Sequence, residues 1–361
     1  MSFETESESL GFCSPDDLPV RYIDRTHAWY DALGTNNHYR YASFDEVPFT
    51  QLAKPLAQCR IGLLTTAARF DPDKGQQDSK APYNAGAKFY NAYTGSTALD
   101  HDLRIAHVGI NRRELTDDSH CWFPLPALRR AAAGGRIGEV APRFIGVPTN
   151  RSQRHTMQTD CPEVLALCRE DAIDAAVLVA NCPVCHQTMS LTARHLEAAG
   201  IPTVVMGCAK DIVETCGVPR FVFSDMPLGS AAARPYDALS QDSTLALALA
   251  LLESAVAPRT TVQNPLRWNG DPGWKFHVLN AAALAPEELE KRKAEQREIK
   301  RTAQAVRDAD MIVTVTTGSA VNVDTPWLKP GAFIARMGSY QEVALELLLE
   351  ADKLVVDPCG L

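Results

Sequence analysis

The sequence predicts an α/β protein with parallel βαβ sheets in two lobes and a smaller C-terminal α/β lobe. Apolar runs of strand length alternate with helical segments of about a dozen residues in the middle of the chain, and such alternation is typical of parallel βαβ units. The 361 residues, 45% of them hydrophobic, suffice for more than one domain of ordinary size. We expect a polar N-terminal arm (1–20), a first α/β lobe (21–150), a second α/β lobe (151–270), and a C-terminal helix with a small Rossmann-like lobe (271–361).

The first lobe opens with residues 21–58, whose aromatic and proline content suggests a short helical lead-in. An apolar run of strand length follows at 60–67 and ends in small residues. Residues 69–100 show no clear periodicity, so we expect a long loop there, and such loops are usually functional. A second strand is expected at 103–106 and a helix at 125–133, which Gly134 and Gly135 end.

The second lobe has clearer periodicity. Helices are expected at 161–170, 188–199 and 245–254, and strands at 174–180, 201–206 and 220–223. In the C-terminal lobe, residues 286–309 predict a charged, solvated connecting helix. Strands are expected there at 311–316, 332–335 and 353–357.

The formal net charge of −8 would repel nucleic acid and anionic membranes, so neither is expected as a partner. No apolar run approaches the roughly 20 residues that span a bilayer. The first eight residues are acidic and polar, unlike a signal peptide. These features predict a cytoplasmic protein.

Cysteine usage points to the chemistry. In a reducing compartment, ten cysteines are expected to be thiols rather than a disulfide framework. Most stand singly among apolar residues, as small buried side chains do. Only Cys182 and Cys185 have the spacing of a redox or metal-binding pair. The ten are Cys13, Cys59, Cys121, Cys161, Cys168, Cys182, Cys185, Cys208, Cys216 and Cys359.

The Cys182-Pro-Val-Cys185 motif lies just past a predicted buried strand and at or before a helix start. In parallel sheets, ligands gather outside the carboxyl ends of the strands. Free N–H groups and the dipole at a helix N-terminus stabilise a thiolate, so Cys182 is expected to be accessible and nucleophilic. Cys185, one helical turn on, would resolve an adduct as a disulfide. The sequence therefore predicts a thiol-dependent oxidoreductase that acts on a small polar substrate.

Three alternatives remain open. The motif can be half of a zinc site, completed by two ligands from His186, Cys208, Cys161 and Cys216. The two cysteines can simply fill space. A non-redox lyase or isomerase would use Cys182 and Cys208 as acid and base. Because no second CxxC occurs, we expect no bound metal or other cofactor.

Further residues are candidates for the same site. Arg104 can pair with a substrate carboxylate, and His107 or His120 can move a proton to a leaving group, with Asp118 orienting the ring. The remaining substrate-binding candidates flank the predicted strand ends: Thr65, Thr66, Asn181, His186 and Cys208.

Over about residues 20–270 the chain resembles the selenoprotein B family of glycine, sarcosine and betaine reductases, which also includes a proline reductase subunit. The resemblance is carried by Ile61-Gly-Leu-Leu-Thr-Thr-Ala67, Asp102 with Arg104 and His107, Asp118 before Phe123-Pro-Leu125, Gly135-Arg-Ile-Gly138, Asp174-Ala-Ala-Val-Leu178, Gly200-Ile-Pro-Thr203, Pro219-Arg220 and Pro227-Leu-Gly229.

This resemblance implies reductive cleavage of a carbon–nitrogen or related carbon–heteroatom bond, with Cys182 at the selenocysteine position and Cys185 as its partner. Family members act on a substrate held as a Schiff base on a pyruvoyl group of a separate subunit. The resemblance also implies a partner subunit and a thioredoxin-like reductant. We further expect the chain to form a homo-oligomer. Sulfur in place of selenium is a weaker nucleophile, so the substrate or its activation is expected to differ.

The C-terminal lobe is similar to the distal half of an ornithine cyclodeaminase/mu-crystallin domain. The matching segments are Ala309-Asp-Met-Ile-Val-Thr-Val-Thr316, Trp327-Leu-Lys-Pro-Gly331, Met337-Gly-Ser339 and Ala351-Asp-Lys-Leu-Val-Val-Asp357. No glycine occurs between Gly273 and Gly318, so the phosphate-binding turn of that family is missing. We expect this lobe to serve structure or oligomerisation.

Overall fold

The structure is a computed structural model of the chain. It describes residues 18–35, 38–81, 84–107, 110, 115–268, 273–294, 297, 309–314 and 328–336. The chain divides into two compact units, one formed by residues 1–28 and 39–283 and the other by residues 29–38 and 284–361.

The larger unit is built on one eight-stranded sheet, seven of whose strands lie in the order β10-β9-β8-β7-β1-β6-β3, with β5 pairing the start of β1. All neighbours are parallel except β3, which runs antiparallel to β6. The strands are β1 (Arg60–Thr65), β3 (Tyr93–Ser96), β5 (Glu139–Val140), β6 (Arg143–Gly146), β7 (Ala175–Val179), β8 (Thr203–Gly207), β9 (Arg220–Phe223) and β10 (Thr260–Gln263). A separate antiparallel pair joins β2 (Ala68–Arg69) to β4 (Leu103–Arg104).

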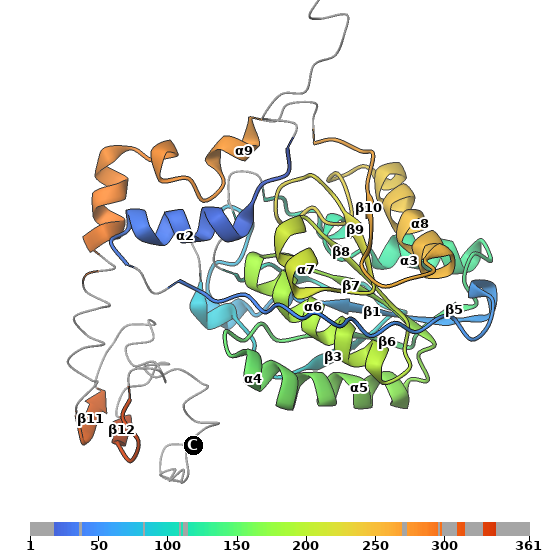
Figure 1. Ribbon diagram of the computed structural model, residues 1–361, viewed down its shortest axis with the longest axis horizontal. Helices are drawn as coiled ribbons and strands as arrows, with labels where there is room; N and C mark the ends of the chain where they lie inside the picture. Colours follow the sequence, from blue (N-terminus) through green and yellow to red (C-terminus); the bar gives the residue numbers. More distant parts are fainter. Residues whose placement is uncertain are drawn as a thin grey trace, which may run out of the picture. The chain divides into compact units, whose positions relative to one another are not determined.

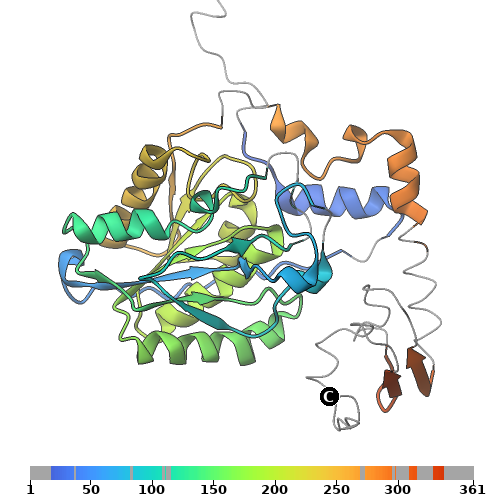
Figure 2. The ribbon, with the colours of Figure 1, turned by 180° about the vertical axis from the view of Figure 1, so that it is seen from behind.

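Helices cover both faces of the sheet (Figures 1 and 2). The α-helices that the structure describes in full are α2 (Tyr22–Ala32), α3 (Leu125–Ala133), α4 (Gln153–His155), α5 (Cys161–Glu170), α6 (Pro183–Ala198), α7 (Lys210–Cys216), α8 (Ala238–Ser254) and α9 (Trp274–His277). Short turns of other helix types are η2 (Leu56–Gln58), η3 (Pro72–Lys74), η4 (Ala85–Ala87), η5 (Ser119–Cys121), η6 (Thr156–Asp160) and η7 (Ala281–Ala283).

Two hydrophobic cores fill the space between the sheet and its helices. Because side chains alternate along a strand, β7 sends Val177 to the core under α3 and α8, and Leu178 to the core under α5, α6 and α7. All five residues of β7 and of β8 are buried. Continuous apolar strands of this kind are typical of a parallel sheet with both faces covered.

The α/β class with a mostly parallel sheet is confirmed. The boundary expected at residue 150 does not divide two sheets, because β1 from the first predicted lobe pairs along its length with β7 from the second. Parallel neighbours need no proximity in sequence, so the chain crosses from β6 over β1 to β7 through α5. The two predicted lobes therefore share one sheet.

Several elements differ from the sequence prediction. The segment 69–100, expected to be a loop, contains the edge strand β3. The helix expected from residue 188 begins at Pro183, so the dithiol motif lies in its first turn. Strand β6, strand β10 and helix α7 were not predicted, because each is short or follows another element closely.

In the smaller unit, β11 (Met311–Thr314) pairs in parallel with β12 (Phe333–Arg336). These strands occupy two of the three positions predicted there. Residues 286–294 are helical, at the start of the predicted charged helix. The third predicted strand, at 353–357, lies outside the described residues.

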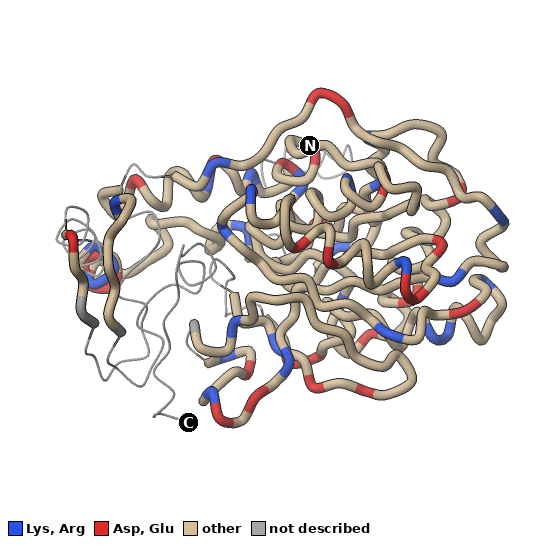
Figure 3. Tube along the Cα trace, turned by 90° about the horizontal axis from the view of Figure 1, so that it is seen from below, with Lys and Arg blue, Asp and Glu red and all other residues tan. Residues whose placement is uncertain are grey.

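Acidic and basic residues are interspersed along the trace of the larger unit rather than gathered in one stretch (Figure 3). Among the described residues, no helix combines the length and the apolar character needed to cross a bilayer.

Candidate active site

The candidate site lies at the carboxyl edge of the sheet, where β1 and β7 end side by side. The chain leaves β1 toward β6 by way of α3 on one face, and it leaves β7 toward β8 by way of α6 on the other face. Neighbouring strands whose connections take opposite faces form a topological switch point, where α/β proteins usually bind ligands. Thr66 follows β1 at this point, and Asn181 and Cys182 follow β7.

Cys182 is the N-cap of helix α6. Its backbone is extended (φ −109°, ψ 171°), and its Sγ accepts the backbone N–H of Cys185 at 3.1 Å. Pro183 occupies the first helical turn, where its missing N–H costs no hydrogen bond. The sulfur therefore takes the place that a Ser or Asp oxygen usually has at a helix start.

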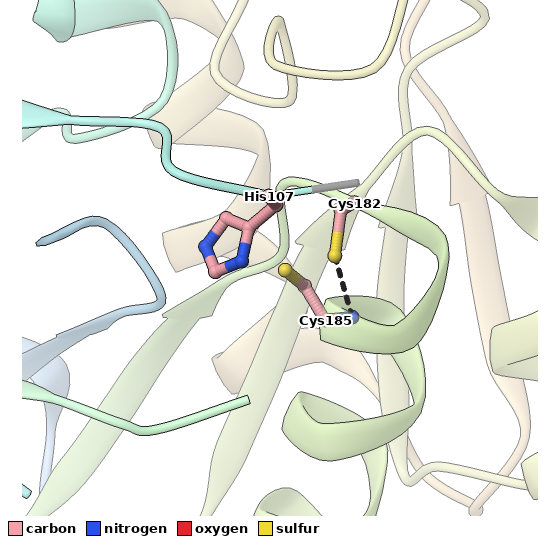
Figure 4. Close-up of side chains that lie close together, drawn as sticks. All are labelled: His107, Cys182 and Cys185. Carbon is pink, nitrogen blue, oxygen red and sulfur yellow. Dashed lines mark hydrogen bonds between the residues drawn. The ribbon is translucent and has the colours of Figure 1, made fainter. Parts of the chain in front are cut away.

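Cys182, Cys185 and His107 form one cluster, with their sulfur and ring-nitrogen atoms all within 4.8 Å of one another. His107 comes from the segment after β4, on the far side of the dithiol from α6 (Figure 4). The Thr149 hydroxyl, after β6, lies 3.6 Å from the Cys185 sulfur. Loops after β4, β6 and β7 thus contribute to the cluster.

The contacts of His107 fix its tautomer. Its Nε2 lies 2.6 Å from the backbone carbonyl of Thr66, and a carbonyl oxygen can only accept, so Nε2 carries the proton. In the neutral ring, Nδ1 then has a free lone pair, and this nitrogen faces the Cys185 sulfur in Figure 4. His107 is placed to take a proton from the dithiol and to return it.

The pKa values of the two thiols are shifted in opposite directions. Burial, together with the neighbouring Cys185, raises the pKa of the Cys182 thiol well above its ordinary value. Burial alone would also raise the pKa of Cys185, but the hydrogen bond with Cys182 and the charge and hydrogen bond of His107 hold it well below its ordinary value. The pair therefore loses one proton easily and keeps the second, as coupled groups do.

The expectation of an accessible thiol is wrong for the described part of the chain. Cys182 is 2% exposed, Cys185 is fully buried and His107 is 5% exposed. The cluster is not surrounded by apolar groups alone, since Thr66, Thr149 and Asn181 are buried beside it or next to it in sequence. The site is a buried polar cluster at a sheet edge.

His186 joins the start of α6 to the end of β8. Its Nδ1 donates to the Cys182 carbonyl at 2.7 Å, and its Nε2 accepts the backbone N–H groups of Cys208 and Ala209. Burial lowers the pKa of this ring to about 4, so it is neutral at physiological pH. A Cβ at Gly207 would come within 2.6 Å of Nε2, so glycine is needed there. Both ring nitrogens of His186 are used by the main chain, which leaves none for a substrate.

The two threonines at the carboxyl end of β1 and the asparagine before the dithiol are fully buried. Thr65 accepts the N–H of Ala67, and Thr66 accepts a hydrogen bond from Nδ2 of Asn181 at 3.1 Å. No described residue donates to Oδ1 of Asn181. A buried acceptor without a partner is costly, so this atom is suited to a ligand or a bound water.

Other predicted site residues make their contacts elsewhere. Arg104 pairs with Asp102 and lies over the Phe70 ring. Asp118 accepts the N–H groups of His120 and Tyr236, and its Oδ1 lies 3.3 Å from Nδ1 of His120, so it contacts the alternative histidine rather than His107, outside the cluster.

Cys208 is buried outside the cluster, and burial raises the pKa of its thiol to about 12. The lyase alternative, which needs Cys208 beside Cys182, gains no support from this placement. The cluster contains none of the four candidates for the additional zinc ligands, which were His186, Cys208, Cys161 and Cys216. Its third member is His107. Thr149 was not predicted, although the apolar run before Pro148 gives a weak strand-end signal.

Comparison with curated proteins supports the resemblance found in the sequence. The D-proline reductase subunit gamma of Acetoanaerobium sticklandii is 27% identical over 189 residues, 52% of this chain and 75% of that protein. The glycine reductase complex component B subunit gamma of Carboxydothermus hydrogenoformans is 26% identical over 229 residues, 61% of this chain and 49% of that protein. The sarcosine reductase complex component B subunit beta of Peptoclostridium acidaminophilum is 24% identical over 190 residues, 51% of this chain and 42% of that protein.

The alignments thus cover three quarters of one relative but less than half of the other two. No protein-family profile matches the chain. No solved structure matches it significantly. In sequence, this chain is similar to subunits of the proline, glycine and sarcosine reductase complexes, the selenoprotein B family to which its motifs point.

Proposed function

We propose that this chain is the thiol-bearing component of a reductase that cleaves a carbon–nitrogen bond of a small amino acid or related amine. The observation that carries the proposal is the cluster of Cys182, Cys185 and His107 within 4.8 Å at the switch point of the sheet. A dithiol of this spacing can supply two electrons, and the histidine can move the accompanying proton.

In the proposed reaction, the Cys182 sulfur gives its proton to the Cys185 thiolate and attacks the carbon that bears the nitrogen. A C–S bond forms, the C–N bond breaks, and the amine leaves with its electron pair and takes up a proton. The Cys185 thiolate then attacks the Cys182 sulfur and breaks the C–S bond. The carbon leaves with the bonding electrons and takes up a proton, while the dithiol becomes a disulfide.

Cys182 is the proposed attacking sulfur, because its Sγ caps α6 at the edge of the sheet and accepts the N–H of Cys185, which stabilises negative charge as it develops. Burial raises the pKa of its thiol, so the Cys185 thiolate, whose pKa is lowered, takes the Cys182 proton as the C–S bond forms. His107, facing Cys185, is placed to remove the proton from the resolving thiol. Burial separates the sulfurs from bulk solvent, which would otherwise compete with the proton transfers.

Partners and substrates are proposed from the relatives. These relatives are subunits of proline, glycine and sarcosine reductase complexes, so we propose that this chain works with a further subunit and on substrates of that class. A thioredoxin-like dithiol protein would return the disulfide to the reduced state.

The redox role is tested by counting thiols before and after mild oxidation with diamide, in denaturant after quenching. The wild-type chain is expected to lose two of its ten thiols together, and Cys182→Ser and Cys185→Ser are expected to lose none. Cys208→Ser is the matched control, since it removes a buried cysteine outside the cluster and should still lose two.

Substrate attack is tested with Cys185→Ser, which cannot resolve an adduct. Incubation with D-proline, glycine or sarcosine and the other subunits of the complex is expected to add the substrate's carbon fragment to the peptide containing Cys182, as seen by mass spectrometry. Retention of all thiols in oxidised wild type, or failure of Cys182 in the folded reduced chain to react with any small electrophile, would overturn the proposal.

A further inference from the structure

We propose that the reduced cluster also binds one thiophilic divalent cation of the Zn²⁺ type, through the sulfurs of Cys182 and Cys185 and Nδ1 of His107. The ion would engage both sulfurs and hold them out of reaction. This inference goes beyond the proposed function, because binding requires only the three side chains and neither a substrate nor a partner subunit.

The ligand set suits such an ion. Zn²⁺ binds thiolate sulfur at about 2.3 Å and imidazole nitrogen at about 2.0–2.1 Å, so a tetrahedral site places its ligand atoms roughly 3.4–3.8 Å apart. The three atoms here lie within 4.8 Å of one another, so movements of about an ångström or less would bring them to that geometry. A CxxC pair in the first turn of a helix supplies both sulfurs from one rigid element.

The orientation of His107 is that of a metal ligand. Metal-binding histidines almost always donate their second ring N–H to a carbonyl or carboxylate, which fixes the tautomer. His107 donates Nε2–H to the Thr66 carbonyl at 2.6 Å and leaves Nδ1 toward the sulfurs. Thr66 follows β1 directly, so the sheet holds this outer contact in place.

A fourth position remains for water or another ligand. Among the described residues the cluster supplies three side chains, and three protein ligands with one open position are typical of reactive rather than structural zinc sites. Oδ1 of Asn181, buried next to Cys182 and without a donor among the described residues, is suited to accept a hydrogen bond from water in that position. This accounts for a buried polar atom that the protein itself does not satisfy.

Metal binding is tested with the full-length reduced chain after removal of metals by a chelator. Titration with Zn²⁺ against a chromophoric chelator is expected to give one ion per chain. Co²⁺ is expected to show thiolate-to-cobalt charge transfer in the near ultraviolet and the intense visible bands of a tetrahedral site. Cys182→Ser and Cys185→Ser should abolish the charge-transfer band, and His107→Ala should weaken affinity roughly tenfold or more. Cys208→Ser should bind as wild type does.

Occupancy is read independently by diamide oxidation. The Zn²⁺-loaded chain is expected to keep all its thiols during oxidation. After a chelator removes the ion, oxidation should again consume two thiols. Absence of stoichiometric binding, a cobalt spectrum without sulfur charge transfer, or unchanged affinity in His107→Ala would overturn this inference. None of these results alters thiol loss in the metal-free chain, so failure of the metal site and failure of the redox proposal are distinguishable.

Discussion

His107 gives its two ring nitrogens different tasks. Nε2 is held by the Thr66 carbonyl, and this contact keeps Nδ1 free and directed at the sulfurs. The interaction with His107 is one of the causes that lower the pKa of Cys185, second to the hydrogen bond with Cys182. Ionisation of the buried pair therefore depends on a residue outside the CxxC motif.

Replacing His107 by Phe should raise the pH at which the dithiol first ionises. The ring would still fill the space, but the interactions through which His107 favours the Cys185 thiolate would be lost, so the pKa of Cys185 should rise. The thiolate absorbance at 240 nm, followed against pH and corrected with Cys185→Ser, measures the shift. His120→Phe is the control, since His120 is half exposed beside Asp118. Coincident titration curves for wild type and His107→Phe would contradict this role.

Gly207 is a second residue on which the site depends, although it carries no chemistry. A methyl group there would overlap the His186 ring, which bridges the first turn of α6 and the backbone after β8. Gly207→Ala should destabilise the fold by about 1–3 kcal/mol and slow thiol oxidation, because the ring must move. Urea unfolding and the rate of diamide oxidation measure the two effects. Gly86→Ala, where the nearest atom is 3.4 Å from the new Cβ, should change neither; equal behaviour of the two variants would refute the argument.

At the scale of elements, a buried ion pair fastens the amino end of the sheet. Glu197, in the last turn of α6, pairs with Arg220 of β9 at 2.8 Å, and both side chains are fully buried. Glu197 also accepts the N–H groups of Thr50 and Thr203, while Arg220 donates to the Thr50 carbonyl. One pair therefore connects a helix, two strands and the segment that precedes β1.

Breaking the buried ion pair of Glu197 with Arg220 should lower the free energy of unfolding far more than breaking an ion pair at the surface. Arg220→Met leaves the Glu197 carboxyl buried without its partner, so we expect a loss of about 3–5 kcal/mol in the free energy of unfolding. The double variant Glu197→Gln with Arg220→Met should recover part of this lost free energy, because it leaves no unpaired carboxyl in the interior. Arg130→Ala, which breaks the half-exposed pair with Asp242, should cost at most about 1 kcal/mol. Equal losses in Arg220→Met and Arg130→Ala, by chemical denaturation, would contradict this account.

The elements that were predicted correctly are those whose pattern is local. Helix α5 follows an amphipathic pattern, and β9 is an apolar run between a proline and a polar turn. Strand β3 was missed because its residues are only half-buried at the sheet edge and show no clean alternation. The start of α6 was placed too late because Cys182, which caps the helix, is not an ordinary capping residue.

The candidate site was predictable only in part, for the same reason. The CxxC spacing is a local signal, and the carboxyl end of a parallel strand is a general place for chemistry. That His107 rather than His186 meets the sulfurs depends on the path of the loop after β4, which no local pattern encodes. The ion pair of Arg104 with Asp102 is likewise a contact that only the folded chain reveals.

At the scale of the whole molecule, the sheet joins the two halves of the larger unit. β1 lies between β6 and β7, so strands from before and after residue 150 are mutual neighbours. The second predicted lobe was distinguished by its clearer periodicity, and periodicity carries no information on which strands pair. The pairing of β1 with β7 makes separate unfolding of the halves costly, because it would expose β7, which is fully buried, and β1, which is buried except at its first residue.

We therefore expect the two halves to unfold as one cooperative unit. In native-state hydrogen exchange, amides of β1 and β7 should exchange with the same free energy of opening, because each strand protects the other. Mass spectrometry of peptides that cover the two strands provides the measurement. A clearly lower protection of one strand would indicate independent lobes.

The interactions at the start of α6 also affect the reduction potential of the dithiol. The hydrogen bond between the two sulfurs of this first turn and the contact with His107 favour a negative sulfur at residue 185, and a neutral disulfide loses most of that benefit. Interactions that stabilise only the reduced state raise the reduction potential of the pair. An electron donor then reduces the disulfide more readily. In the proposed reaction, the first turn of α6 thus favours reduction of the disulfide, and the driving force for each turnover has to come from the bond that is broken.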